Sequence, residues 1–226
     1  MAADDLDQAV RRADPDRWLA SRFIADPGAR ADVIAVYAFD HELARAGVVA
    51  SQPLIAEIRL TWWREALDEI FAGRTVRAHP VAQALAACAK RHDLPRASLE
   101  AMIDARIAVL DQARLTLAQA TAWAEAVGGS TATLAARILD LTSPDGAASP
   151  AGIVWGLITL RRAGSIDAAE IDPLIFETLA AARIAARRLS VAAFPAVAHA
   201  NLARARSGSE VTKRLRLLAA VVTGRI

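Results

Sequence analysis

Apolar and polar positions recur along this chain with the period of an α-helix. In residues 30–46 the apolar side chains fall on one side when each residue turns the helix by about 100°. A second segment, 51–72, has a broad apolar face that includes Trp62 and Trp63, and Gly73 follows where helices commonly end. We expect Gly47 to end the first helix. The pattern therefore predicts two antiparallel neighbouring helices.

The rest of the chain repeats this pattern in shorter segments separated by proline and glycine. Asp14-Pro15 is typical of a helix start, and Gly128-Gly129 allows two helices to approach closely or to bend. Extended runs rich in valine, threonine and tyrosine, which are typical of strands, are absent from the sequence. The clearest interruption is TSPDGAAS, residues 142–149, which we interpret as a flexible linker. We therefore predict an all-α bundle of about ten helices and a single domain over residues 1–226.

Composition narrows the function. Apolar residues make up 54% of the chain and aromatic residues 5%, which favours helices packed through small side chains. The net charge is +2, and no block of like charges suggests a nucleic-acid partner. Cys88 is the single cysteine, so an intrachain disulfide and a CxxC zinc cluster are excluded. The longest apolar run, AGIVWGLITL, has about half of the ~20 residues that a membrane span needs. We expect a cytoplasmic protein.

Two charged residues interrupt apolar faces. Asp40 lies on the apolar side of the first helix, and Arg59 lies within the apolar face of the second. A buried charge without a partner lowers the stability of the fold by on the order of several kcal/mol. One interpretation is that Asp40 and Arg59 form a buried ion pair that locks the two helices together. The other is that Arg59 faces a pocket and binds an anion.

The remaining candidates for chemistry are weak. The four histidines lack metal-ligand spacing, and no GxSxG, P-loop or GxGxxG motif occurs. The last helix, from about residue 209, carries Lys213, Arg214 and Arg216 beside leucines. It either makes peripheral contact with an anionic membrane surface or a partner, or packs on the core and leaves a solvated face.

Several stretches resemble one enzyme family. WLASRF, AVYAFDHELARAG and EIRLTWWREALDEIFAG followed by HPV are similar to the squalene/phytoene synthase family, and the likeness continues to WGLITLRRAG. WWREALDEIFAG is the most specific part. Membership implies an all-α isoprenoid-synthase fold with a central cavity. Candidate residues that line the pocket are Tyr37, Trp62, Trp63 and Arg162.

The family's metal-binding motifs do not appear at the matching positions. Synthases of this family hold diphosphates through Mg²⁺ bound by two aspartate-rich motifs, since Mg²⁺ requires oxygen ligands. The first motif falls on Ala44 and Val48, and the second on Arg162 and Ile166. We therefore assign no catalytic residue, no metal ligand and no cofactor. The sequence resembles more closely a branch without these motifs, which includes a mitochondrial assembly factor for respiratory complex I.

Three functional hypotheses follow. The leading one is a catalytically inactive protein that binds a partner protein or an isoprenoid-like lipid in respiratory complex assembly. The second is an active Mg²⁺-dependent prenyltransferase, acting on farnesyl or geranylgeranyl diphosphate, that uses the displaced carboxylates of Asp40, Glu42 and Asp167. The third is a structural module whose cavity is filled by side chains.

Overall fold

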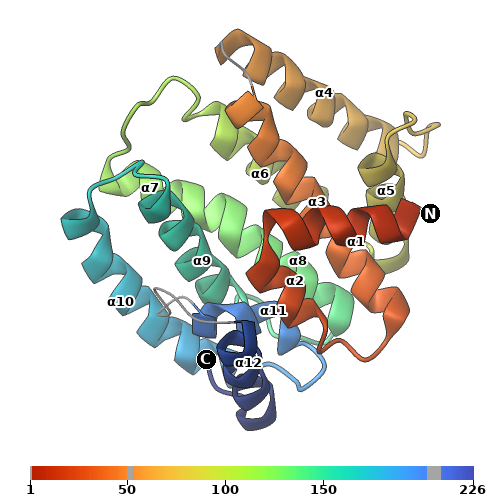
Figure 1. Ribbon diagram of the computed structural model, residues 1–226. Coiled ribbons are helices and arrows are strands. Elements are labelled where there is room, and N and C mark those ends of the chain that lie inside the picture. Colours follow the sequence, from red (N-terminus) through yellow and green to blue (C-terminus); the bar gives the residue numbers. More distant parts are fainter. Residues whose placement is uncertain (1, 50–52, 203–209) are drawn as a thin grey trace.

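A computed structural model describes residues 2–49, 53–202 and 210–226, and every regular element in these ranges is helical (Figure 1). The first half of the chain forms α1 (Ala2–Ala13), α2 (Pro15–Ser21), α3 (Pro27–Val49), α4 (Pro53–Phe71), α5 (Pro80–His92) and α6 (Arg96–Ile107). Proline stands at the first position of α2 and α5, where its missing N–H costs nothing. Gly73, with φ of 64°, follows α4. The predicted helix start at Asp14-Pro15 and the predicted helix end at Gly73 are confirmed.

The second half continues in the same way. It forms α7 (Leu117–Ala124), the π-helix η1 (Glu125–Gly129), α8 (Ser130–Leu139), α9 (Ser149–Arg162), α10 (Ala168–Ala186), α11 (Pro195–Ala198), the 3₁₀ helix η2 (His199–Leu202) and α12 (Glu210–Thr223). The predicted linker 142–149 falls on the connection between α8 and α9, two helices that pack against each other. The all-α prediction is confirmed for the described residues.

α3 and α9 each contact several other helices. α3 contacts α1, α4, α5, α6 and α8, whereas α9 contacts α7, α8, α10 and η1. The main apolar core surrounds α3 and α8, and a smaller cluster joins α7, α9 and α10. Figure 1 shows α4 along the upper edge of the bundle, α10 along the lower left and α12 at the bottom. No helix in the described ranges is both long and apolar enough to cross a bilayer.

The glycines of η1 and α9 allow the closest helix approach. A Cβ on Gly128 would lie 2.2 Å from the carbonyl oxygen of Gly152, and a Cβ on Gly152 would lie 2.0 Å from that of Gly128. Real Cβ atoms do not approach an oxygen so closely, so both positions require glycine. The expectation that the Gly128-Gly129 pair permits close approach is confirmed.

The sequence misplaced one helix end and missed one helix. α3 continues through Gly47 to Val49, because glycine lowers helix stability by only about 1 kcal/mol and tertiary packing outweighs it. α1 was not predicted because it has few apolar residues; Leu6 and Val10 are its buried contacts. Tertiary bonds also hold it, since Asp7 accepts hydrogen bonds from Trp18 and Arg22.

Candidate functional site

The candidate site is a buried charge cluster in the centre of the bundle. Asp40 lies on α3 with 4% of its surface exposed. Arg17 of α2 donates from Nη1 to its Oδ2 over 2.6 Å, and Arg106 of α6 donates from Nη2 to its Oδ1. Both arginines are buried as well. One carboxylate therefore joins three helices.

The surroundings of Asp40 keep it ionised. Burial alone would raise its pKa, but the positive charges of Arg106 and Arg17, and the hydrogen bonds that they donate, lower the pKa below its usual value. Burial lowers the pKa of Arg106, opposed by the carboxylate of Asp40. Arginine nevertheless stays protonated in proteins because its usual pKa is above about 12. The cluster is a charged triad of two cations and one anion.

A second carboxylate approaches this triad from the start of α2. Asp14 caps the helix by accepting a hydrogen bond from the backbone nitrogen of Arg17 over 3.0 Å. Its Oδ2 also lies 3.6 Å from Nε of Arg17. Burial raises the pKa of Asp14, and Arg17 opposes this shift.

Aromatic rings complete the walls of the cluster. The guanidinium carbon of Arg17 lies 3.5 Å from the ring centroid of Trp155 and 5.2 Å from that of Tyr37. The guanidinium carbon of Arg106 lies 5.6 Å from the ring centroid of Trp123. Such cation–π contacts stabilise desolvated guanidinium groups by about 2 kcal/mol or more. Tyr37, a predicted pocket residue, is buried against Arg17 with 3% of its surface exposed.

Not every polar atom of the cluster is satisfied. His199 of η2 is 3% exposed, and neither of its ring nitrogens has a hydrogen-bond partner among the described atoms. The same holds for Nη2 of Arg17. Burial, and secondarily the charge of Arg17, lowers the pKa of His199 well below its usual value. A cavity of about 10 Å³ beside His199 and Trp155 has room for one water molecule.

The predicted partner of Asp40 is wrong. The structure pairs Asp40 with Arg17 and Arg106, whereas Arg59 is exposed on α4. The reason is that the buried stripe of α4 runs through Ala56, Leu60, Trp63 and Leu67, and Arg59 lies outside this stripe. Leu54 is 64% exposed and Ile58 is 60% exposed. In the sequence, Arg106 lies within the apolar stripe of its own helix, and this position was the available signal for its burial.

Arg59 instead lines a surface groove between α3 and α4, with a volume of about 380 Å³. Trp62 and Trp63 line this surface groove, together with His79. The two indole rings meet edge to face at 5.0 Å between centroids, and His79 packs against both. Binding of an anion at Arg59 stays a prediction.

The residues at the metal-motif positions do not fit Mg²⁺. Ala44 is exposed and offers a methyl group, and Ile166 is buried in the smaller apolar cluster. Arg162, the predicted pocket residue, lies at the end of α9 beside the small cavity near His199, and its positive charge opposes a cation. In the described ranges no group of three histidine, cysteine or acidic side chains is arranged to hold a metal ion.

The three carboxylates of the prenyltransferase hypothesis each have another structural role, and among the described residues they form no group that could hold a metal ion. Asp40 is bound by two arginines. Glu42 pairs with Arg45 over 2.9 Å on the outer side of α3. Asp167 is the N-cap of α10 and accepts a hydrogen bond from the backbone nitrogen of Ala169 over 2.8 Å.

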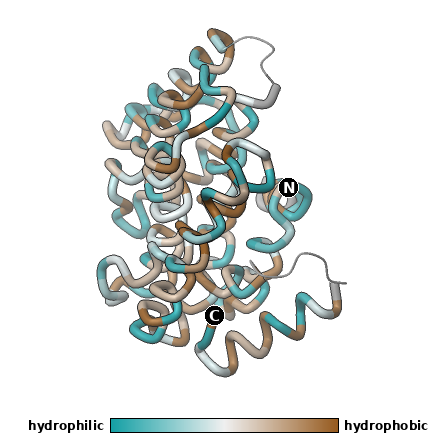
Figure 2. The backbone as a smooth tube through the Cα atoms, turned by 90° about the vertical axis from the view of Figure 1, so that its left-hand side faces the viewer, coloured by the Kyte–Doolittle hydropathy of each residue, from teal (hydrophilic) through white to brown (hydrophobic). Residues whose placement is uncertain are grey.

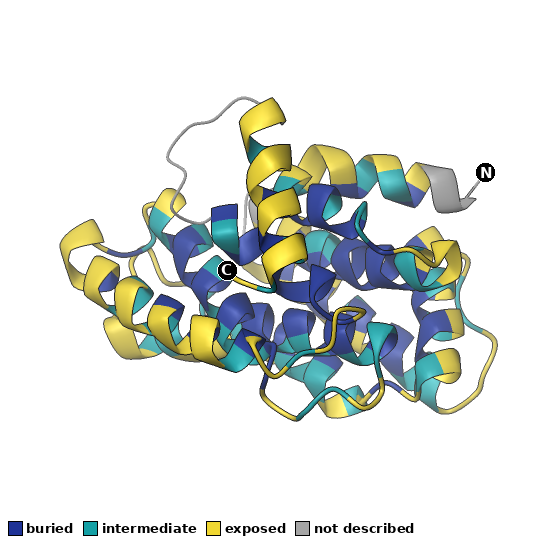
Figure 3. Cartoon of the chain, turned by 90° about the horizontal axis from the view of Figure 1, so that it is seen from below, coloured by how far each residue is buried: buried dark blue, intermediate teal, exposed yellow. Residues whose placement is uncertain are grey.

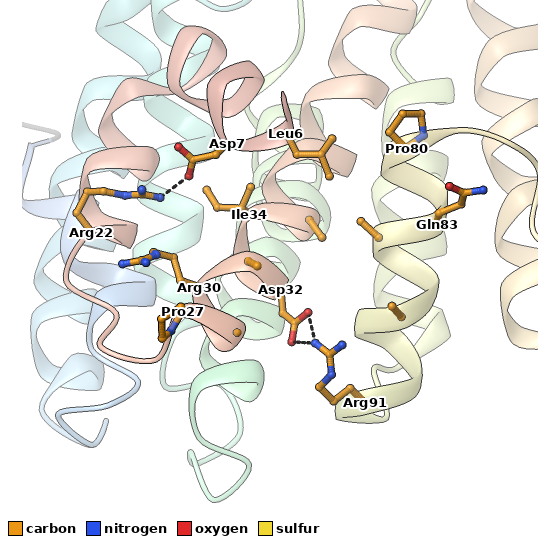
Figure 4. Close-up of a pocket in the computed structure, with 15 residues that line it drawn as sticks. Leu6, Asp7, Arg22, Pro27, Arg30, Asp32, Ile34, Pro80, Gln83 and Arg91 are labelled. Atoms are coloured by element: carbon orange, nitrogen blue, oxygen red, sulfur yellow. Dashed lines mark hydrogen bonds and ion pairs between the residues drawn. The ribbon is translucent and has the colours of Figure 1, made fainter. Parts of the chain in front are cut away.

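A larger hollow of about 720 Å³ lies between α1, the start of α3 and α5. Figure 4 shows its acidic side chains bound to arginines, with Asp7 facing Arg22 and Asp32 facing Arg91. Asp32 also contacts Nε2 of His92 over 2.7 Å. The acids of this hollow are thus neutralised by neighbouring cations.

The helical architecture and the polar centre define the class of protein, which is that of the isoprenoid-synthase fold. A crystal structure of a dehydrosqualene synthase with bound ligand superposes with a TM-score of 0.72, covering 98% of this chain and 95% of that one at 13% identity. The model of the squalene/phytoene synthase family matches residues 10–207. The chain belongs to the squalene/phytoene synthase family.

The similar sequences are those of assembly factors, whereas the similar structure is that of a synthase. The NADH dehydrogenase (ubiquinone) complex I assembly factor 6 of Homo sapiens is 29% identical over 159 residues, and that of Rattus norvegicus is 30% identical. Both matches cover 69% of this chain and 47% of the relative. The chain thus spans about half the length of these relatives.

Proposed function

We propose that this chain is a catalytically inactive member of the squalene/phytoene synthase family that binds a partner protein during assembly of a respiratory complex, and that it works in the cytoplasm. The assembly role rests on the relatives named complex I assembly factor 6. The observation that carries the loss of catalysis is the Arg17–Asp40–Arg106 triad in the centre of the bundle.

The triad supports inactivity for an electrostatic reason. A prenyl-diphosphate synthase of this family needs carboxylates that are free to hold Mg²⁺ against the diphosphate leaving group. Asp40 has both carboxylate oxygens bound to guanidinium groups. Ala44 and Arg162 occupy positions where the resemblance places metal ligands. The proposal therefore includes no cofactor.

The groove between α3 and α4 is the proposed partner surface. Leu54, Ile55 and Ile58 are 64%, 38% and 60% exposed beside it. An exposed apolar strip next to a groove fits an amphipathic helix of a partner, which buries its own apolar face there. An isoprenoid-like lipid is the alternative occupant of this groove, because the triad and its aromatic walls fill the centre.

A direct assay tests catalytic inactivity. The protein is incubated with farnesyl or geranylgeranyl diphosphate and Mg²⁺, with an active family synthase as the positive control. We expect no diphosphate release. Release that depends on Mg²⁺ would overturn the proposal and favour the prenyltransferase alternative.

A genetic assay tests the assembly role. We expect that deletion of the gene in its own cells reduces the fully assembled NADH dehydrogenase complex on native gels, and that the wild-type chain restores it. Ile58→Asp, which places a charge in the groove, should fail to restore assembly. Leu141→Asp is the matched control, because Leu141 is 62% exposed outside the groove. Normal assembly in the deletion strain would refute the proposed role.

A further inference from the structure

The inner face of the C-terminal helix α12 packs against the bundle. Leu217 and Ala220 are buried there, and so is Ile226 at the chain end. Lys213 forms an ion pair with Asp16 over 2.7 Å. Arg183 of α10 donates from Nε to the carbonyl oxygen of Ile226 over 2.9 Å. These contacts fix which side of α12 faces outward.

The outward side of α12 is apolar, although none of the residues that the structure describes covers it. Val211, Leu215, Leu218 and Val222 are 65%, 61%, 48% and 76% exposed. Their spacing of four, three and four residues places them in one stripe along the helix. Figure 3 shows α12 exposed along its length, and Figure 2 shows it standing at the edge of the bundle. A terminal helix that only packed on the core would have a polar outer side.

The end of α10 extends this surface. Ile184 is 70% exposed and Val191, just beyond the helix, is 82% exposed. Figure 1 shows the chain end beside this part of α10, in agreement with the bond from Arg183 to Ile226. We name the exposed side chains of residues 183–191 and 211–225 the C-terminal surface.

Positive charge is concentrated in the same part of the chain. Residues 178–226 hold nine of the 27 lysines and arginines but one of the 25 acidic residues. Arg187, Arg188, Arg216 and Arg225 are exposed. None of these four forms an ion pair with a carboxylate in the part of the chain that the structure describes. The near-neutral net charge of the whole molecule therefore conceals a basic surface.

We propose that the C-terminal surface docks on an anionic membrane, with the apolar stripe of α12 inserted among the lipid headgroups and the arginines bound to lipid phosphates. Amphipathic helices that lie on membranes combine an apolar stripe with basic flanking residues in this way. Arginines spread over the segment that follows α10 and over α12 with the residues that follow it match the diffuse negative charge of a lipid surface. This site is distinct from the groove between α3 and α4, so the proposal does not depend on the assembly role.

Vesicle flotation tests the proposal. The full chain is mixed with phosphatidylcholine vesicles, with and without phosphatidylglycerol. We expect binding to the anionic vesicles that weakens with added salt, and little binding to the neutral ones. Arg216→Gln and Arg225→Gln should each weaken binding about fivefold. Arg59→Gln on α4 is the matched charge control and should have no effect.

Substitutions in the stripe test the apolar part. Leu215→Gln with Leu218→Gln should abolish flotation, whereas the matched control Leu54→Gln with Ile58→Gln on α4 should leave it unchanged. Attachment of a polarity-sensitive dye provides a second measurement on variants with fewer changes. The dye at Leu215→Cys should shift to shorter wavelength with anionic vesicles, and the dye at Leu54→Cys should not.

Three outcomes would overturn the proposal. The wild-type chain remains unbound to both kinds of vesicle, or the stripe variants float as well as the wild type. In the third, sedimentation shows that the wild-type chain is a dimer, that Leu215→Gln with Leu218→Gln makes it a monomer, and that vesicles do not dissociate the dimer. A second copy of the chain would then cover the stripe.

Discussion

Arg17 and Asp40 lie 23 positions apart in the chain and meet in the buried centre of the bundle, where Nη1 donates to Oδ2 over 2.6 Å. The Arg17 guanidinium is also stacked on Trp155. Arg106, 66 positions from Asp40, binds the other carboxylate oxygen. The pair therefore depends on the correct packing of α2, α3 and α6. Loss of any one of these contacts leaves a charge in an apolar interior.

Asp40→Asn should be strongly destabilising. The substitution keeps the shape of the side chain but removes the negative charge between two buried cations. Breaking a buried ion pair on one side costs about 3–5 kcal/mol, because the remaining charge stays desolvated. We expect the midpoint of chemical unfolding, followed by circular dichroism, to fall accordingly.

Asp104→Asn is the matched control for this prediction. Asp104 pairs with Arg64 on the surface, where the two side chains are 59% and 45% exposed. Exposed pairs contribute about 0–1 kcal/mol. If both variants unfolded at the wild-type midpoint, the triad would have no stabilising role.

The sequence predicted the burial of Asp40 but not its partners. Helical periodicity shows which side of α3 faces inward, and Asp40 lies on that side. It carries no information on which distant segment supplies the opposing charge. Arg17 follows an ordinary helix start, and only the tertiary fold brings it to Asp40. The partner therefore could not be derived from spacing.

In α4, helical periodicity predicted too much burial. Its apolar pattern predicted a broad buried face, but the buried side chains form a narrower stripe through Leu60, Trp63 and Leu67, and Ile55 and Arg59 lie outside it. Periodicity indicates which residues share a face, and the packing of the neighbouring helices decides how wide a part of that face is covered. Arg59 was assigned to the core for this reason.

Gly152→Ala should destabilise the crossing of α9 and η1. The new Cβ would lie 2.0 Å from the carbonyl oxygen of Gly128 and 2.7 Å from Cβ of Ala132, so the helices must move apart. Overpacking of this kind costs about 1–3 kcal/mol or more. Thermal unfolding measures the change.

Gly47→Ala gives the matched control with the opposite expected sign. Gly47 lies in the exposed part of α3, and the nearest atom to an added Cβ is Cδ2 of Leu110 at 4.0 Å. Alanine in a helix is favoured over glycine by about 0.5–1 kcal/mol. A stabilised Gly152→Ala protein, or a strongly destabilised Gly47→Ala protein, would contradict the packing described.

Acid should destabilise the protein through His199. Burial keeps the folded-state pKa well below the usual value, so the unfolded chain takes up a proton on this residue near its ordinary pKa and the folded chain does not. The unfolded state is therefore favoured as pH falls below about 6.5, by up to about 1.4 kcal/mol per pH unit. Unfolding midpoints measured from about pH 7 to pH 5 should fall steadily.

His199→Leu isolates this contribution, because leucine does not titrate and the ring nitrogens that it replaces have no described partner. Asp14 and His41 also have shifted pKa values, but they remain in both proteins. The stability of the wild type should therefore fall relative to the variant as the pH decreases. If the stability of the wild type and of the variant changed equally with pH, His199 would be protonated in the folded protein or would not occupy the buried position.

Cys88 should be inert in the folded protein. Its side chain on α5 is fully buried, Sγ donates to the carbonyl oxygen of Asp32 at 3.7 Å, and burial raises the thiol pKa to about 12. Because the thiolate is the reactive form, a thiol reagent such as an aromatic disulfide should modify Cys88 only when α5 opens or the chain unfolds. Labelling should therefore follow the denaturant-induced unfolding curve. Leu215→Cys supplies an exposed thiol that should react at once under the same conditions. Rapid modification of the wild-type chain without denaturant would show that α5 is not held against α3 as the structure describes.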